Sequence, residues 1–400
     1  MFKLRACGSL SNAAFGLQLL IGFLSGIHPS LAGSSAQLEI VFLALETKIP
    51  AALSSLDPII RDEGVPGAEL GARDNNTTGR FTGQNFLLNV VEVADPDSAV
   101  AAYQNEVKQG RSLFVTRLPA VVIRKFAALP ESATSLILDI STSDDALRIN
   151  LCHPGILHIR PSRAMRTDAL AQYMLKKRWR KWFLVVGPSP EDGLYAEAVR
   201  RAAKRYGMTI VEERSWQSAH DARRTAESEV PVLTQASDYD VLVVADEEGL
   251  FGEYLAYRTW LPRPVIGTQG LVATAWDRSH EQWGAVQLQN RFKESAGRWM
   301  SEQDYAAWLA VRVIGEAATR TGMSDPESLR AFIRSPDFSV AGFKGRKLSF
   351  RSWNGQLRQP ILLAGPRSLV GVAPLEGFLH PKDELDSLGY DEVEVECGHR

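Results

Sequence analysis

The sequence has few cysteines, no excess of positive charge and no apolar run long enough to cross a membrane. Its 400 residues contain three cysteines, which allow at most one disulfide, and carry a formal net charge of −2. That charge gives no reason to expect a nucleic-acid partner. A hydrophobic content of 45% with 23% charged residues is typical of soluble globular proteins, and the length favours two lobes over one ordinary domain.

The sequence also lacks the motifs of the common enzyme classes. It has no Gly-x-Ser-x-Gly nucleophile elbow, no His-Glu-x-x-His metal motif and no Walker A phosphate loop. Cys152, His153 and His158 lie close together along the chain, but their spacing is not that of a zinc site. We therefore expect neither an enzyme nor a metal or cofactor site. An enzyme with an unrecognised site is one alternative.

The N-terminus has the three parts of a secretory signal. Two basic residues lie within the first five positions, residues 15–24 are mostly apolar, and small residues stand at Ser30 and Ala32. Because the apolar run is shorter than a spanning helix, we predict a signal peptide at residues 1–32 that is cleaved after Ala32 and directs the protein to the periplasm. An uncleaved membrane anchor is the alternative.

Export would place the two remaining cysteines, Cys152 and Cys397, in an oxidising compartment. An even pair there predicts one disulfide, between Cys152 and Cys397. That bond would anchor the end of the chain, since residues 376–400 are polar and acidic, show no core pattern and are expected to form a solvated tail. Two unpaired buried thiols are the alternative to the disulfide.

Residues 160–216 contain the clearest structural pattern of the chain. Ser162 can cap a helix whose apolar residues recur at helical spacing. The unbroken apolar run Trp182–Val186 suits a strand buried on both faces. A second helix follows and ends where Gly207 supplies a C-terminal cap, and residues 208–212 form the next strand. This succession of strand, helix and strand predicts a parallel sheet.

The rest of the chain repeats this alternation. Further strands are predicted at residues 38–43, 86–93, 113–115, 135–140, 240–245 and 265–267. Helices are predicted at 97–110, 121–129, 221–233 and 303–320, and a hairpin at 350–357. In residues 67–81 we expect a helix only in the first half, because the second half is rich in turn-forming residues. The alternation predicts an α/β fold of two doubly wound, parallel-sheet lobes joined by a hinge.

Several stretches of the sequence resemble type I periplasmic binding proteins, the solute-binding proteins of ABC transporters that include the branched-chain amino acid-binding type. The residues that carry the resemblance are 71–81 (GARDNNTTGRF), 161–165 (PSRAM), 181–188 (KWFLVVGP) and 385–389 (LDSLG). They are most similar to the branch associated with alcohol dehydrogenase systems that depend on pyrroloquinoline quinone (PQQ). The resemblance covers nearly all of the predicted mature chain.

The resemblance implies two lobes that hold a small-molecule ligand between them and a hinge of three strands. It places lobe 1 at residues 36–158 and 266–340, and lobe 2 at residues 159–265 and 341–375. It also implies a periplasmic protein, expected to be a monomer, that delivers its ligand to an ABC transporter permease at the inner membrane. The main alternative to this transport role is a ligand sensor or accessory protein of the alcohol dehydrogenase system without a role in transport.

Ligands of such sheets bind beyond the carboxyl ends of the strands. Polar residues at those ends are the candidate ligand-binding residues: Ser141, Thr142, Tyr195, Asp246, Glu247 and Gln269. In amino-acid-binding relatives, hydroxyls at the first position bind a carboxylate, the tyrosine closes over the ligand, and an acid at the last position binds the ammonium group. Here the last position is Gln269, and Pro119 lacks the N–H that a donor loop needs. We therefore expect a neutral or singly charged polar ligand rather than an α-amino acid.

Overall fold

The computed structural model describes residues 36–46, 59–216, 226–256 and 258–396 of the chain. The predicted signal peptide and Cys397 lie outside these residues, as does the start of the helix predicted at 221–233. The described residues all belong to one compact unit. Among them, no helix is both long and apolar enough to span a bilayer.

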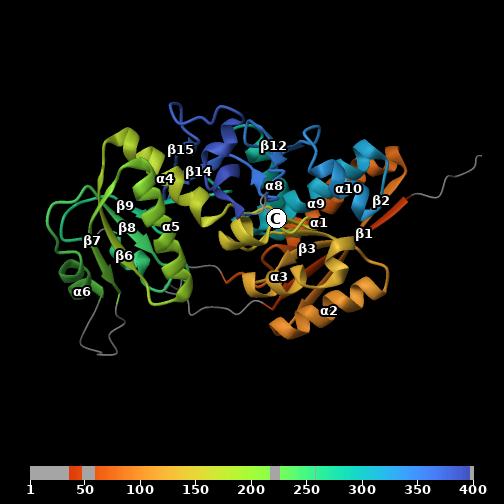
Figure 1. The fold of residues 1–400 in the computed structure, drawn as a ribbon, viewed down its shortest axis with the longest axis horizontal. Coiled ribbons are helices and arrows are strands. Elements are labelled where there is room, and N and C mark those ends of the chain that lie inside the picture. Colours follow the sequence, from red (N-terminus) through yellow and green to blue (C-terminus); the bar gives the residue numbers. More distant parts are fainter. Residues whose placement is uncertain (1–35, 47–58, 217–225, 257, 397–400) are drawn as a thin grey trace, which may run out of the picture. The chain divides into compact units, whose positions relative to one another are not determined.

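The first sheet has five parallel strands in the order β2-β1-β3-β4-β5 and forms lobe 1 (Figure 1). Its strands are Ala36–Leu45 (β1), Gln84–Val93 (β2), Leu113–Arg117 (β3), Leu136–Asp139 (β4) and Ile156–His158 (β5). The core on one face includes residues of α1 (Val65–Thr82), α8 (Ala285–Ala296), α9 (Glu302–Thr321) and α10 (Pro326–Ile333). The other face is covered by α2 (Pro96–Lys108) and α3 (Ala120–Ala127).

The second sheet forms lobe 2 and has seven strands in the order β15-β14-β10-β9-β8-β6-β7. Its strands are Lys181–Val186 (β6), Thr209–Ser215 (β7), Val241–Ala245 (β8), Val265–Gly267 (β9), Leu271–Thr274 (β10), Ile361–Ala364 (β14) and Leu369–Ala373 (β15). Strands β14 and β15 are antiparallel to their neighbours, and the other pairs are parallel. One face carries α4 (Arg163–Lys177) and α5 (Pro190–Tyr206); the other carries α6 (Ala226–Leu233) and α7 (Gly252–Leu255).

Burial on both faces explains why the central strands are apolar throughout. Along β6, Trp182 and Leu184 belong to the core beneath α4 and α5, whereas Phe183 and Val185 belong to the core on the opposite face. Alternate residues of a strand point to opposite faces, so a strand covered on both sides needs an unbroken apolar run. The predicted α/β fold of two doubly wound, largely parallel sheets is confirmed, and so are the Ser162 cap of α4 and the Gly207 cap of α5.

The predicted hairpin belongs to a small antiparallel sheet, β11-β12-β13, that packs into the core of lobe 1. Its strands are Val340–Ala341 (β11), Lys347–Phe350 (β12) and Leu357–Arg358 (β13). Phe350 pairs with Leu357, so the hairpin is confirmed. Its connection, residues 351–356, is longer than the two-residue turn that Asn-Gly favours.

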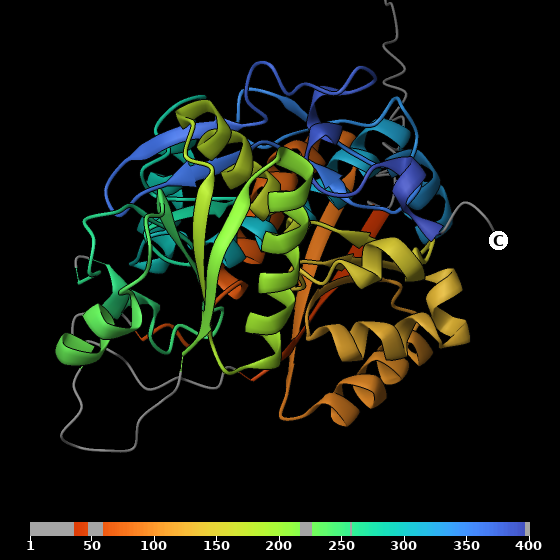
Figure 2. The ribbon, with the colours of Figure 1, turned by 60° about the vertical axis from the view of Figure 1, so that its left-hand side comes forward.

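Within the described residues, the chain crosses between the two lobes three times, in the segments 159–162, 275–284 and 359–360. The second and third crossings differ in place from the predicted lobe boundaries. Strands β9 and β10 belong to the sheet of lobe 2, although residues 266–340 were assigned to lobe 1. Strands β12 and β13 pack in lobe 1, although they follow residue 341. Figure 2 shows the same ribbon with the lobe 2 side turned forward.

Helix α1 extends through the turn-forming residues to Thr82, so the prediction that only the first half of this stretch is helical is wrong. The helix lies against α9 at a distance that only small residues allow. A Cβ atom on Gly67 would lie 2.0 Å from the backbone oxygen of Asp304, and one on Gly71 would lie 2.9 Å from that of Trp308. These tertiary contacts outweigh the weak helix propensity of the sequence.

The C-terminal segment is packed against the protein, so the expectation of a solvated tail is wrong for residues 376–396. Leu385, Leu388 and Val395 are buried. The segment contains two short 3₁₀ turns, Glu384–Ser387 and Glu392–Glu394. The sequence did not predict this packing, because the buried apolar residues are spaced irregularly among acidic ones and show neither the helical nor the strand period.

Candidate functional site

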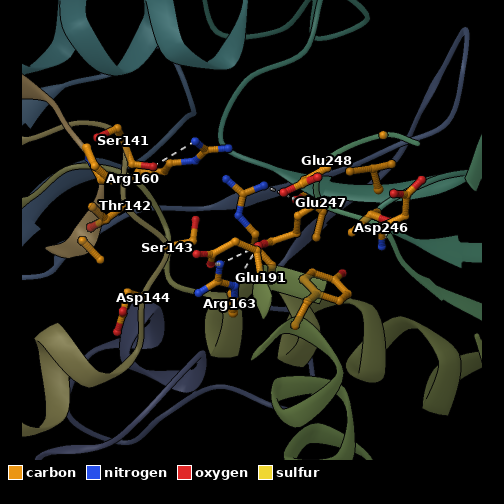
Figure 3. Close-up of a pocket in the computed structure, with 18 of the residues that line it drawn as sticks. Ser141, Thr142, Ser143, Asp144, Arg160, Arg163, Glu191, Asp246, Glu247 and Glu248 are labelled. Carbon is orange, nitrogen blue, oxygen red and sulfur yellow. Dashed lines mark hydrogen bonds and ion pairs between the residues drawn. The ribbon is translucent and has the colours of Figure 1, made fainter. Parts of the chain in front are cut away.

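A cavity of about 600 Å³ lies at the carboxyl ends of strands from both sheets. All six predicted ligand-binding residues line it: Ser141, Thr142, Tyr195, Asp246, Glu247 and Gln269. The serine and threonine follow β4, the two acids follow β8, Gln269 follows β9, and Tyr195 lies on α5. Figure 3 shows residues 141–144 on one side of the cavity and residues 246–248 on the other. The structure thus brings the predicted positions together.

Ser141 and Thr142 use their hydroxyl hydrogens within the protein. The Ser141 hydroxyl donates to the Leu118 carbonyl oxygen at 2.7 Å and accepts from the Leu118 N–H at 2.9 Å. The Thr142 hydroxyl donates to the carboxylate of Asp139 and accepts from Arg148 at 3.3 Å. A hydroxyl has a single hydrogen to donate. Neither group can therefore donate to a ligand carboxylate unless it first breaks one of these bonds.

Ser143 and Tyr195 are better placed to contact a ligand. Both side chains line the cavity and are largely buried, at 9% and 3% exposure, and neither hydroxyl has a hydrogen-bond partner among the described residues. Burial raises the pKa of the Tyr195 hydroxyl well above its ordinary value, so the group stays protonated and can donate. Ser143 follows directly after the two predicted residues of the same loop. A buried hydroxyl without a protein partner is expected to find one in a ligand or in water.

Asp246 supports the loop that follows β8. Its carboxylate accepts hydrogen bonds from three backbone N–H groups, those of Leu250 at 2.9 Å, Phe251 at 2.9 Å and Gly252 at 2.6 Å. These bonds lead the chain into α7. The side chain is 1% exposed, so this carboxylate shapes the wall of the cavity through the loop that it holds.

Three arginines at the start of α4 also line the cavity and were not predicted: Arg160, Arg163 and Arg166. Arg163 is paired with Glu191 and donates to Glu247 at 2.9 Å (Figure 3). Arg163 and Arg166 lie three residues apart in the first turn of α4 and so share one side of the helix, whereas Arg160 precedes the Ser162 cap. A row of basic residues at the carboxyl end of β5 was the signal in the sequence that could have found them.

The other two arginines share Glu302, an acid of α9. Arg166 lies 2.7 Å and Arg160 3.3 Å from its carboxylate, which also accepts from the Ala275 N–H. Burial alone would raise the pKa of Glu302, but Arg166 and Arg160 outweigh it and hold that pKa at about 2. The cluster connects α4 of lobe 2 with α9 of lobe 1 through permanent charges.

Most of the charged side chains that line the cavity are therefore paired with opposite charges, several of which lie outside it. Arg117 is paired with Glu92, and Asp144 with Arg124. Glu248 is the exception, because it lines the cavity without a hydrogen bond or ion pair to any described residue. The half-buried amide of Gln269 likewise has no hydrogen-bond partner among the described residues. The side-chain groups of the cavity without a partner among the described residues thus include two hydroxyls, one amide and one carboxylate, together with the Nε atoms of Arg160 and Arg166.

The loop after β3 offers the cavity no free N–H at Leu118 or Pro119. Leu118 and Pro119 line the cavity, and the only N–H between the two residues is bonded to Ser141. A second cavity of about 560 Å³ adjoins the first and shares Asp144, Arg163 and Glu191 with it. The combined space is larger than a small amino acid needs.

The chain is similar to periplasmic binding proteins in sequence and in structure. The family model described as periplasmic binding protein matches residues 51–249, just under half of the chain. No curated protein matches the chain in sequence. Among solved structures, a periplasmic binding protein from Burkholderia mallei has 14% sequence identity and a TM-score of 0.64, with 91% of this chain and 99% of that one covered.

Two further solved structures differ in the ligands that their descriptions name. A branched-chain amino acid ABC transporter ligand-binding protein from Burkholderia xenovorans has 16% identity and a TM-score of 0.67, covering 84% of this chain and 95% of that one. A solute-binding protein from Rhodopseudomonas palustris, in complex with 3,4-dihydroxybenzoic acid, has 13% identity and a TM-score of 0.60, covering 82% and 93%. At such identities the likeness establishes the fold and leaves the ligand open. The chain has the two-lobed α/β fold of the periplasmic binding proteins.

Proposed function

We propose that this protein is the periplasmic solute-binding component of an ABC transporter, which closes its two lobes on a small ligand and presents it to a membrane permease. The observation that carries the proposal is the cavity at the carboxyl ends of both sheets, lined by all six predicted positions. The match to the periplasmic binding protein family model supports it, as do the neighbours described as ABC transporter proteins. On this proposal the protein binds its ligand without chemical turnover.

The free groups of the cavity favour a neutral or singly charged polar ligand. A buried zwitterion needs a partner at both ends, since an unpaired buried charge costs several kcal/mol. The cavity arginines Arg160, Arg163 and Arg166 are already paired with acids, and Gln269 supplies an amide at the position where an amino-acid binder has a carboxylate. Glu248 can accept from a single cationic group or from a hydroxyl.

Binding experiments with the mature protein test this proposal. Native mass spectrometry of protein purified from the periplasm should show a co-purified small molecule. After unfolding and refolding to remove that molecule, titration calorimetry with leucine, isoleucine and valine should show no tight binding. A dissociation constant of about 1 μM or lower, near −8 kcal/mol, for any of the three would contradict the proposed ligand class. Conversion of the co-purified molecule into another compound would indicate an enzyme.

The proposed link to PQQ-dependent alcohol oxidation rests on the motif resemblance of residues 71–81 and 385–389. It suggests a metabolite of alcohol oxidation as cargo. The alternative is a ligand sensor or accessory protein of that system. Crosslinking in intact cells distinguishes the two, because a transport component should capture a permease subunit, whereas a sensor should capture a component of the oxidation system.

Export and the disulfide are parts of the same proposal. Cleavage after Ala32 predicts that N-terminal sequencing of exported protein starts at Gly33. Pairing of Cys152 with Cys397 predicts no free thiol in denatured, unreduced mature protein. Met1 at the N-terminus would contradict the first prediction, and two titratable thiols would contradict the second.

A further inference from the structure

The C-terminal segment, residues 376–396, is attached to both lobes, and we call it the strap. It follows β15 and is the darkest blue part of the described chain in Figures 1 and 2. Its attachments lie close to the crossings between the lobes. One group of contacts is made with the connection 351–356 and β13, just before the crossing at 359–360, and the other with α4 and α5 of lobe 2.

The attachment to lobe 1 is a buried ion pair surrounded by backbone contacts. Arg351 and Asp386 are 1% and 2% exposed, and the Arg351 Nε donates to the Asp386 carboxylate at 2.8 Å. Arg358 donates to the same carboxylate oxygen at 2.8 Å. The remaining guanidinium nitrogens of Arg351 donate to strap carbonyl oxygens, those of Leu385 at 3.1 Å, Leu388 at 2.8 Å and Tyr390 at 3.3 Å. One arginine of lobe 1 thus organises the whole central turn of the strap.

The attachment to lobe 2 is centred on Gly389. Its N–H donates to the Asp168 carboxylate of α4 at 2.9 Å, and its carbonyl oxygen accepts from Arg201 of α5 at 2.9 Å. The backbone has φ +81°, and a Cβ atom here would lie 2.7 Å from Met165, so glycine is required twice over. The guanidinium of Arg201 also lies 3.9 Å from the ring centre of Tyr390. The neighbouring Leu388 is buried in the core of lobe 2.

We propose that the strap sets how far the two lobes can open. Hinge motion must change the separation between Arg351 and α5, and the strap joins them through consecutive residues. If the strap lost its contacts with lobe 1, the Arg351 guanidinium or the Asp386 carboxylate would remain buried without its partner, which is strongly unfavourable. If the strap lost its contacts with lobe 2, the fully buried Asp168 carboxylate would lose the hydrogen bond from the Gly389 N–H. The strap therefore limits opening and narrows the range of lobe positions.

The strap also borders the ligand cleft. Tyr390 lines the second cavity, together with Arg163 and Glu191, which it shares with the first cavity. A change in the strap would therefore alter the width of the cleft at this end even without ligand. This inference does not depend on the proposed ligand or on a transport role, and it is tested on the ligand-free protein.

The test weakens one attachment at a time in the full mature chain. Asp386→Asn removes the buried charge that Arg351 and Arg358 share, and Glu384→Gln is the matched control, because Glu384 belongs to the same turn but is 44% exposed in its pair with Arg346. Hydrogen exchange of the crossing amides, those of Ile159, Arg160, Ser162 and Gln359, and small-angle scattering are measured for both variants. We expect exchange at the crossings to accelerate about tenfold or more in Asp386→Asn, with a larger radius of gyration, and no change in the control.

Arg201→Met weakens the attachment to lobe 2, because it removes the bond to the Gly389 carbonyl oxygen and the contact with Tyr390 but leaves the bond from the Gly389 N–H to Asp168. It is the second test if Asp386→Asn does not fold. It should give the same faster exchange at the crossings and the same larger radius, because either attachment alone cannot hold the two lobes together. If the amides of the strap exchange faster while those of the crossings and the radius of gyration match wild type, the strap is only a surface feature of one lobe. That outcome overturns the proposal.

Discussion

The polar groups around the cleft fall into two sets that differ in whether their hydrogen bonds are already made. At the junction of the lobes, Glu302 binds Arg160 and Arg166, and Lys344 donates to Gln359 and to the Pro360 carbonyl. In the cavity, the hydroxyls of Ser143 and Tyr195 have no partner among the described residues. Paired buried groups hold the lobes in place, whereas unpaired ones leave room for a ligand.

The largest effect is expected when a charge is removed from the paired set, the buried polar groups at the junction of the lobes that already have partners. Glu302→Gln leaves Arg160 and Arg166 facing an amide, and the partial exposure of Arg160 moderates the cost. We expect a loss of about 2–4 kcal/mol in the free energy of unfolding, less than for a fully buried pair. Urea denaturation at pH 7 measures it, with Glu281→Gln, an exposed acid, as the control.

The same variant should respond to pH in a defined direction. The pKa of Glu302 is about 2 in the folded protein, below its ordinary value of 4.5. A carboxyl with a lowered pKa contributes stability that is complete above pH 4.5 and is lost as the pH falls towards 2. The difference between wild type and Glu302→Gln should therefore shrink steadily below pH 4.5. A difference that stays constant down to pH 3 would show that the charge is not what holds the lobes together.

Lys344 also belongs to the paired set, but its burial disfavours the protonated, charged form of the side chain. Burial lowers the pKa of its ammonium group from 10.5 to about 7, although Glu302 partly opposes this. Between these values the unfolded chain binds a proton that the folded protein does not, so stability should rise with pH from 7 towards 10. The slope contributed by this group is at most about 1.4 kcal/mol per pH unit. Lys344→Met should flatten that rise, measured by urea denaturation at pH 7, 8 and 9.

The fold was largely predictable, because strands covered on both faces leave a strong apolar signal. The runs at Trp182–Val186 and Val241–Ala245 are strands in the structure. The second half of α1 was not predictable, since its helix depends on the close approach of α9 at Gly67 and Gly71. Packing of that kind joins residues more than 200 positions apart and leaves no periodic signal along the chain.

Which residues line the cavity was partly predictable from the sequence, but whether each side chain already has a hydrogen-bond partner was not. The carboxyl ends of parallel strands placed Ser141, Thr142 and Asp246 at the cavity. Which hydroxyl is free depends on neighbours distant in sequence: Leu118 binds Ser141, whereas Ser143, two residues further on, is unpaired. Charge pairing across the lobes likewise depends on the folded chain, and for this reason Arg163 was missed.

The smallest expected effect concerns the unpaired set, the cavity hydroxyls of Ser143 and Tyr195. It is the most direct test of the difference between paired and unpaired groups. Ser143→Ala and Tyr195→Phe each remove one free hydroxyl and should weaken binding of the co-purified molecule about fivefold, since a neutral hydrogen bond contributes about 1 kcal/mol. Neither should lower stability, because neither hydroxyl makes a hydrogen bond to another described residue of the protein.

Ser141→Ala, the matched control, should do the reverse: it breaks both bonds to Leu118 and lowers the melting temperature. Calorimetry and thermal unfolding of the three variants separate these outcomes. If Ser141→Ala weakens binding more than Ser143→Ala at unchanged stability, the assignment of paired and unpaired groups is wrong.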